Sequence, residues 1–213
     1  MAEIKKMATR DGYGQGLVEL GKTRDDIIVM DADLAAATKT GAFKKEFPEK
    51  FYNCGIAGGA VSTTLNAFDT DILPHDPTHA VIMIGINDVW HHYAFEFVET
   101  TDEQFEANYR CVLDAIKSRT NARILMIQPF LLETVDPAKQ ELCEELVRKQ
   151  TIVKRLADEY ADAYLPLDEI LHAETEEEPA YYAADGVHPT PDGACCIGEA
   201  YLGAIAPLIE LLS

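Results

Sequence analysis

The stretch AVIMIGIND occupies residues 80–88 and joins an apolar run to a short polar motif. Residues 80–84 carry no charge, which is typical of a strand that is covered on both faces of a parallel sheet. Gly85 permits a sharp turn after this run, and Asn87 follows directly. We therefore expect residues 80–84 to form the central strand of a sheet, with Asn87 at its carboxyl end.

Strand-like apolar runs alternate with helix-like segments along the rest of the chain. Gly21 is placed to end the first helix, and Thr101 with Gln104 has the spacing of a capping box. This alternation predicts a parallel sheet with helices on both faces and a site at the carboxyl ends of its strands. Strands are expected at residues 26–30, 51–54, 123–127 and 163–167, and helices at 9–20, 41–47, 61–73, 101–117, 136–160 and 193–211.

Composition limits the possible partners of these 213 residues, a length that suits one domain. A net charge of −19 argues against nucleic acid or an anionic membrane, because phosphate groups are bound by clustered Lys and Arg. No run approaches the roughly 18 apolar residues of a membrane span, and the start does not read as a signal peptide. Five cysteines without Cys-x-x-Cys spacing indicate neither a disulfide framework nor a zinc knuckle. We expect a cytoplasmic protein.

The run DGVHP at residues 185–189 holds a carboxylate and an imidazole three positions apart. This spacing lets Asp185 accept a hydrogen bond from one ring nitrogen of His188 and leaves the other nitrogen free as a general base. A plain polar turn is the alternative, since Asp, Gly and Pro favour turns in any protein. The run therefore gains its meaning from partner residues elsewhere.

Asn87 and Gly58 are candidate partners for this pair. The side-chain amide of Asn87 can donate to a developing oxyanion, and Gly58 can add a backbone N–H from the neighbouring loop. A turn cap is the alternative role for Asn87. His91 and His92 are interpreted as rim or surface residues rather than metal ligands, because no third ligand has the spacing of a metal site nearby.

From about Asn53 to the C-terminus, the chain resembles the SGNH (GDSL-type) esterases and acylhydrolases. Gly58 matches the second block of that family, GIND at 85–88 the third, and DGVH at 185–188 the fifth. The resemblance implies a flavodoxin-like three-layer α/β/α sandwich with a parallel sheet of about five strands. It also implies cleavage of small or carbohydrate-linked acyl esters by a Ser/His/Asp mechanism without metal or cofactor, and an oxyanion hole that uses Gly58 and Asn87.

Residues 1 to about 57 resemble the start of a transketolase pyrimidine-binding domain. The similar runs are MATRDGYG at 7–14, DADL at 31–34, KTGAF at 39–43 and FYNCGIA at 51–57. In that family a glutamate that activates the thiamine ring follows, and Gly58 stands in its place here. Transketolase activity would therefore lack its main acid/base group. We expect one domain over residues 1–213, in which residues 1–57 supply the first strand, helix and strand.

The nucleophilic serine of the esterase pattern is missing. The serines are Ser62, Ser118 and Ser213, and none follows the first expected strand. Alignment on that strand places Asp33 at the nucleophile's position. An attacking carboxylate would form an anhydride, its charge would oppose the oxyanion, and it would compete for His188, so we expect weak or absent esterase activity. Thr38 and Ser62 are the other candidate nucleophiles.

Three further functions remain open at this stage. The fold could keep its cleft as a non-catalytic binding module. Asp31, Asp33, Asp185 and His188 could instead serve as hard ligands in a metal-assisted hydrolase. A transketolase fragment ranks last. The expected partner is a small-molecule ester, with no nucleic acid and no membrane, and the sequence does not indicate an oligomeric state.

Overall fold

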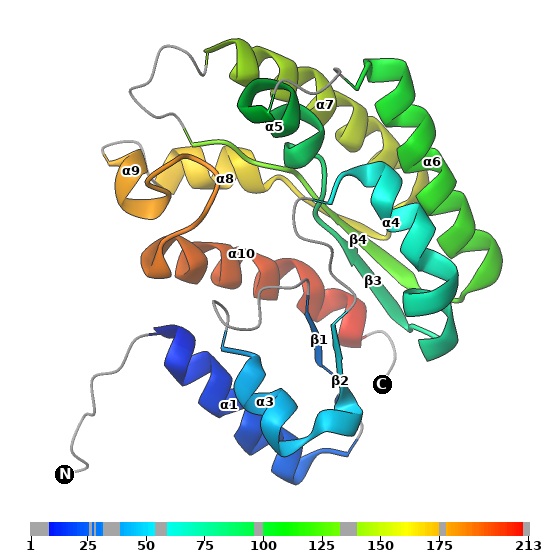
Figure 1. Ribbon diagram of the computed structural model, residues 1–213, viewed down its shortest axis with the longest axis vertical. Coiled ribbons are helices and arrows are strands. Elements are labelled where there is room, and N and C mark those ends of the chain that lie inside the picture. Colours follow the sequence, from blue (N-terminus) through cyan, green and yellow to red (C-terminus); the bar gives the residue numbers. More distant parts are fainter. Residues whose placement is uncertain are drawn as a thin grey trace. The chain divides into compact units, whose positions relative to one another are not determined.

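The chain divides into two compact units, residues 1–58 and residues 59–213. The computed structural model describes residues 9–25, 27, 29–31, 39–53, 59–95, 100–132, 140–174 and 178–210 (Figure 1). The division lies where the two sequence resemblances meet. A single domain over the whole chain stays a prediction.

The described residues of the first unit form a two-stranded parallel sheet and two helices. Val29 pairs with Phe51 at the start of the two strands, and both side chains pack with Phe43 in a small apolar cluster. The elements are α1 (Thr9–Thr23), β1 (Val29–Asp31), α3 (Gly41–Glu46), a 3₁₀ turn (Pro48–Lys50) and β2 (Phe51–Asn53).

Gly21 lies inside α1, so the prediction that it ends this helix is wrong. A Cβ atom at this position would lie 2.6 Å from ring atoms of both Phe43 and Phe47. Any larger side chain would collide with the two rings. Gly21 therefore permits close packing of α1 against α3 rather than a helix end.

The second unit contains the other three described strands. Three of its helices, α5, α8 and α9, were not predicted from the sequence. The expected capping box of α6 is confirmed, because Thr101 accepts from the Gln104 N–H and donates its own N–H to the Gln104 side chain. The elements are α4 (Val61–Ala67), a π-helical turn (Phe68–Ile72), a 3₁₀ turn (Leu73–His75), β3 (His79–Ile82), α5 (Ile86–Phe95), α6 (Asp102–Arg119), β4 (Arg123–Ile127), α7 (Gln140–Tyr160), β5 (Ala163–Leu165), α8 (Leu167–Glu174), α9 (Pro179–Tyr182) and α10 (Pro191–Glu210).

The described strands form two sheets, so the prediction of one parallel sheet of about five strands is wrong for this part of the chain. β3, β4 and β5 form a three-stranded parallel sheet in that order, and β1 pairs with β2. The pairing of β1 with β2 is short, with only three residue pairs. Within each of the two sheets the paired strands run parallel, as predicted.

β4 is the central strand of the three-stranded sheet, and the prediction that β3 is central is wrong. Leu125 and Met126 of β4 are fully buried, whereas Val81 in β3 is 44% exposed and Met83 just after it is 49% exposed. An apolar run was taken as a sign of burial on both faces. It does not distinguish a central strand from an edge strand whose hydrogen bonds are made on one side.

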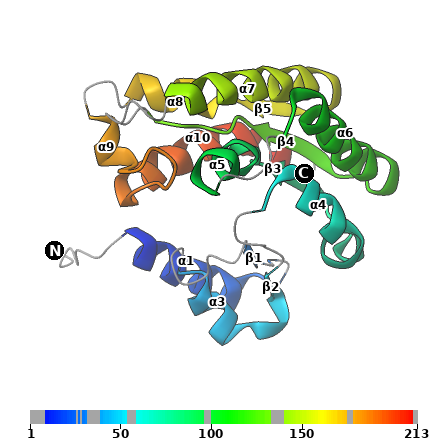
Figure 2. The same ribbon diagram turned by 45° about the horizontal axis from the view of Figure 1, so that its top comes forward.

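Helices cover both faces of this sheet. Ile124 and Met126 of β4 pack in a cluster with buried residues of α6 and α7. The alternate residues, Leu125 and Ile127, pack with buried residues of α8 and α10. Figures 1 and 2 both show α6 and α7 on one side of β3 and β4 and α10 on the other. The second unit is therefore a three-layer α/β/α arrangement.

By length and composition alone, α10 could span a membrane between Pro191 and Ile209. Its Ile205 and Leu208 are buried in the core cluster that contains Leu125. The helix thus covers one face of the sheet. The expectation that no membrane partner exists stays a prediction.

Candidate active site

Asn87 lies in the first turn of α5, directly after the strand β3 and its glycine turn. Gly85 has a φ of +128°, which favours glycine, and a Cβ atom there would lie 3.1 Å from the Phe105 ring. The Asn87 amide donates to the carbonyl oxygen of Gly59 at 3.1 Å. Because a carboxamide has two N–H groups, Asn87 can hold this loop and still donate to an oxyanion.

Asp88, the next residue, is 4% exposed. Its Oδ2 accepts the backbone N–H of Val61 at 3.1 Å and so joins the start of α5 to the start of α4. Burial raises the pKa of Asp88 to about 6, although the Val61 hydrogen bond and the charge of Lys149 oppose the rise. Sequence reasoning gave Asp88 no role of its own, and the structure shows that it anchors the loop beside Asn87.

Asp185 and His188 form a hydrogen-bonded pair on a turn between α9 and α10. The His188 Nδ1 lies 2.7 Å from the Asp185 Oδ2, and the other carboxylate oxygen accepts the N–H groups of Val187 and His188. Partial burial opposes ionisation, but hydrogen bonds from the His188 N–H and ring and from Val187 lower the pKa of Asp185 to about 2. The His188 side chain is 77% exposed. With Nδ1 turned to the carboxylate, Nε2 is available as a base.

Backbone hydrogen bonds hold the ends and the middle of this turn. The Thr190 N–H donates to the Tyr182 carbonyl at 2.8 Å, and the Leu132 N–H donates to the Gly186 carbonyl at 2.9 Å. Gly186 has a φ of +86°. A Cβ atom at Gly193 would lie 2.1 Å from the Tyr182 carbonyl oxygen, so glycine permits α9 and α10 to meet there.

The Asn87 helix and the Asp185–His188 turn meet in one apolar cluster. Val187, between the two site residues, packs against the same apolar cluster to which Ile86 and Val89 of α5 belong. The cluster, called the α5 cluster below, consists of buried Val89, Leu131, Leu142 and Leu146 and partly buried Ile86, Trp90, Tyr93, Cys143 and Val187. The structure therefore brings together the two motifs that are about 100 residues apart in the sequence.

The structure describes only some of the other predicted site residues. Asp33, Gly58 and Thr38 lie outside the described residues, so the nucleophile position and one oxyanion donor stay predictions. Ser62 is exposed at the second position of α4. His91 is half-buried, and the side chain of His92 is outside the described set.

No three His, Cys, Asp or Glu side chains gather closely enough to hold a metal ion among the residues that the structure describes. Asp31 and Asp33, two of the four ligands in the metal hypothesis, have side chains outside that set. The metal hypothesis therefore stays untested by the geometry.

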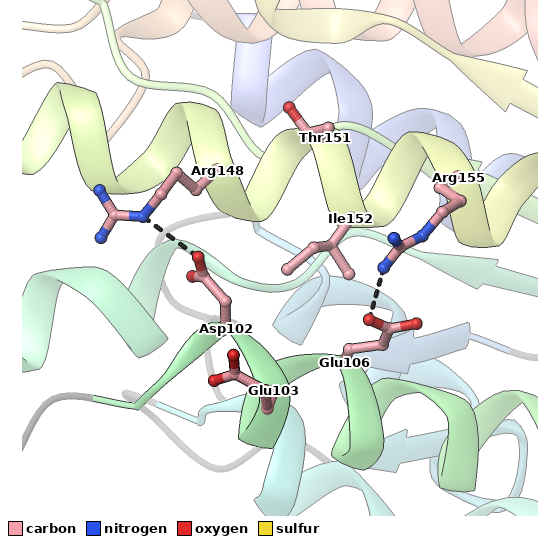
Figure 3. A pocket seen from close by; sticks show the side chains of 7 residues that line it. All are labelled: Asp102, Glu103, Glu106, Arg148, Thr151, Ile152 and Arg155. Carbon is pink, nitrogen blue, oxygen red and sulfur yellow. Dashed lines mark hydrogen bonds and ion pairs between the residues drawn. The ribbon is translucent and has the colours of Figure 1, made fainter.

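A charged groove lies between α6 and α7, apart from the residues of the candidate site. Arg148 bonds to Asp102 at 3.2 Å, and Arg155 bonds to Glu106 (Figure 3). Each of these two ion pairs joins two charged side chains of the groove lining. Its lining consists of Asp102, Glu103, Glu106, Arg148, Thr151, Ile152 and Arg155.

Residues 12–194 match the GDSL-like Lipase/Acylhydrolase family. The chain belongs to this family. The match begins before Asn53, where the motifs first resemble these hydrolases, and it includes both the Asn87 motif and the Asp185–His188 turn. Family membership therefore extends over most of the segment that also resembles transketolases.

The relatives of this GDSL-like chain include an acetylxylan esterase of Geobacillus stearothermophilus. It is 29% identical over 177 residues, which are 78% of this chain and 77% of the esterase. Its solved structure matches with a TM-score of 0.61 at 26% identity and 76% coverage of each chain. Alanine replacements of a serine, an aspartate and a histidine are called catalytic mutants of that esterase. That aspartate precedes the histidine by three positions.

A short segment of this GDSL-like chain is similar to transketolases. A Methanocaldococcus jannaschii protein named for a transketolase C-terminal section is 54% identical over 48 residues. The match covers 22% of this chain and 15% of that protein. The chain thus combines a short transketolase-like segment with a family match that covers most of its length.

Proposed function

We propose that this chain is by descent an acylhydrolase of the GDSL-like family whose nucleophilic serine is replaced, and in which His188 has the place of the general base, Asp185 orients it, and Asn87 is the donor to the oxyanion. The observation that carries the proposal is the 2.7 Å hydrogen bond between Asp185 and the exposed imidazole of His188. The α5 cluster supports it, because the turn and the helix that carries Asn87 both contribute residues to this cluster.

The proposed chemistry follows from the two nitrogen atoms of the His188 ring. Asp185 accepts from Nδ1, which fixes the tautomer in which Nε2 can take a proton from an attacking hydroxyl group. The same carboxylate stabilises the imidazolium that forms. Asn87 then offers an N–H group to the negative oxygen of the tetrahedral intermediate. Neither His188 nor Asn87 can itself supply the attacking oxygen.

The nucleophilic serine is the one part of the mechanism for which this sequence has another residue. Asp33 aligns with the serine position, and an aspartate there would give little or no ester hydrolysis. Removal of a nucleophilic serine can leave catalysis on the order of 10³ over water, which comes from the oxyanion donors and from binding. We infer that the unmodified protein hydrolyses weakly or not at all.

The substrate class that we propose is a small or carbohydrate-linked acyl ester. Its support is the similarity to an acetylxylan esterase, whose aspartate–histidine spacing equals that of Asp185 and His188. The acidic chain, with a net charge of −19, suits a neutral acetylated sugar better than a polyanion.

The test compares the protein as it stands with the triple change Asp31→Gly, Ala32→Asp and Asp33→Ser. Hydrolysis of p-nitrophenyl acetate is measured for both, each with and without His188→Ala and with and without EDTA. We expect turnover only in the triple variant, and we expect His188→Ala to remove it. Ser62→Ala tests the other candidate nucleophile that the structure describes, and it should leave the turnover of the triple variant unchanged, because Ser62 lies in α4 and not at the end of a strand.

Each other outcome identifies a specific error. A folded triple variant without turnover contradicts the alignment of Asp33 with the nucleophile. Strong activity of the unmodified chain that survives His188→Ala contradicts the role of the Asp185–His188 pair. Loss of activity with EDTA supports the metal-assisted alternative.

A further inference from the structure

The turn that carries Asp185 and His188 is bonded to a segment without regular structure, residues 128–132 after β4. Leu132 in this segment donates its backbone N–H to the Gly186 carbonyl at 2.9 Å, and Leu131 lies in the α5 cluster with Val187. Both leucines are buried, with Leu131 4% exposed and Leu132 1% exposed. The position of the turn therefore depends on what holds this segment.

Side chains from two helices hold the segment. The Leu131 N–H donates to the Oδ1 of Asp168 at 3.0 Å, and the Gln150 Nε2 donates to the Pro129 carbonyl at 2.9 Å. A buried backbone N–H requires a partner, and outside a sheet or helix this is a loop carbonyl, a side chain or water. Asp168 supplies the partner for Leu131.

Asp168 is poorly placed for direct contact with solvent or a ligand. Its side chain is 18% exposed in the first turn of α8, where a negative charge is favoured by the helix dipole. Its second oxygen lies 3.5 Å from the Nδ1 of His172. Burial raises the pKa of this carboxyl, against the Leu131 hydrogen bond and the His172 charge. The carboxylate thus serves groups of the protein itself.

We propose that Asp168 is a positioning residue for the Asp185–His188 pair, acting through residues 129–132 and the Leu132–Gly186 hydrogen bond. The inference rests on the proposed function, which gives the pair its role. Asp168 fixes Leu131, the adjacent Leu132 fixes Gly186, and Gly186 lies between the carboxylate and the imidazole. Loss of the Asp168 carboxyl frees the segment and lets the turn move.

The test measures the turn itself by NMR, so it does not depend on activity. In Asp168→Ala, we expect the amide protons of Leu132 and Val187 to exchange about tenfold faster, which corresponds to about 1.4 kcal/mol. The nitrogen shifts of His188 should change from one fixed tautomer to a mixture. Asp168→Asn keeps an oxygen for the Leu131 N–H and should restore both signals.

Asp162→Ala is the matched control. Like Asp168, Asp162 accepts a backbone N–H with its side chain, in this case that of Ile124 at 2.8 Å. Ile124 lies near the start of β4, whereas Leu131 follows the end of that strand. Its loss should speed exchange at Ile124 and leave Val187 and the His188 tautomer unchanged. Where Asp168→Ala does not fold, Gln150→Met loosens the same segment at Pro129 and should give a smaller change of the same kind.

The proposal is overturned if Leu131 loses protection in either variant while Leu132, Val187 and the His188 tautomer keep their parental values. Hydrolysis by the nucleophile-restored protein is measured in parallel and should fall by up to 10²-fold, on the order expected for a catalytic group moved by about 1 Å. A freed turn with unchanged hydrolysis would support the role of Asp168 and contradict the proposed role of the pair.

Discussion

Two aspartate–histidine pairs in the described part of the second unit are used differently. His188 lies 2.7 Å from Asp185 on a turn, with 77% of its side chain exposed. His172 lies 3.5 Å from the carboxylate of Asp168 on α8, and its Nδ1 is 2.8 Å from the Asp168 carbonyl oxygen. The first carboxylate is directed to an open imidazole, and the second to a buried backbone N–H.

The pKa values of the two carboxyl groups move in opposite directions. Hydrogen bonds around the turn outweigh partial burial and lower the pKa of Asp185 to about 2, whereas burial raises the pKa of Asp168. Aspartate and histidine therefore have different roles in the two pairs. Exposure of the ring and the target of the carboxylate distinguish a candidate catalytic pair from a structural one, and residue type alone does not.

The largest expected difference is catalytic. In the nucleophile-restored protein, His188→Ala should reduce kcat/KM for p-nitrophenyl acetate by about 10²–10⁴-fold, the usual contribution of a general base. His172→Ala should leave it close to the parental value, since the Nδ1 of this ring lies against Asp168 of its own helix. Equal losses in the two variants would end the distinction between the pairs.

Stability should show the reverse order. Asp168→Ala leaves the buried Leu131 N–H without its acceptor, and we expect a loss of about 1–3 kcal/mol in the free energy of unfolding. Asp185 is 44% exposed, so water can replace part of its bonding, and Asp185→Ala should cost less than about 1 kcal/mol. Urea denaturation at pH 7 measures both. A more damaging Asp185→Ala would contradict the assignment of roles.

The pH dependence of stability should differ in sign, with the smallest effect. The folded-state pKa of Asp185 is about 2, below the unfolded value of about 3.9, so its contribution is present above pH 4 and is lost as the pH falls towards 2. For Asp168 the folded pKa is raised, so its contribution declines as the pH rises above the unfolded value. Asp185→Asn and Asp168→Asn should therefore change the slope of unfolding free energy against pH in opposite directions. Changes of the same sign would refute this.

Local patterns predicted the elements well where one short segment decides the outcome. The run at residues 123–127 forms β4 as expected, and the Thr101 capping box is present because its two hydrogen bonds lie within four residues. The place of β3 in the sheet was not predictable, since strand order depends on pairing between distant segments. Residues 80–84 have no feature that reports which strand lies beside them.

The candidate site shows the same limit. The Asp185–His188 hydrogen bond could be expected from spacing on a turn, and the structure contains it. Its meeting with α5 through Val187 required tertiary packing. Asp168 gave no sequence signal beyond an acidic residue in a first helical turn, because its partner Leu131 is 37 residues away. The catalytic roles themselves stay predictions.

Gly193 limits how this protein can change during evolution. With no room for a Cβ atom beside the Tyr182 carbonyl, and with Thr190 bonded to the same oxygen, residues 183–190 form a closed loop of fixed length. An insertion or deletion within this loop would displace either His188 or the start of α10. We therefore expect related sequences to vary in composition here but to keep the number of residues between Tyr182 and Gly193.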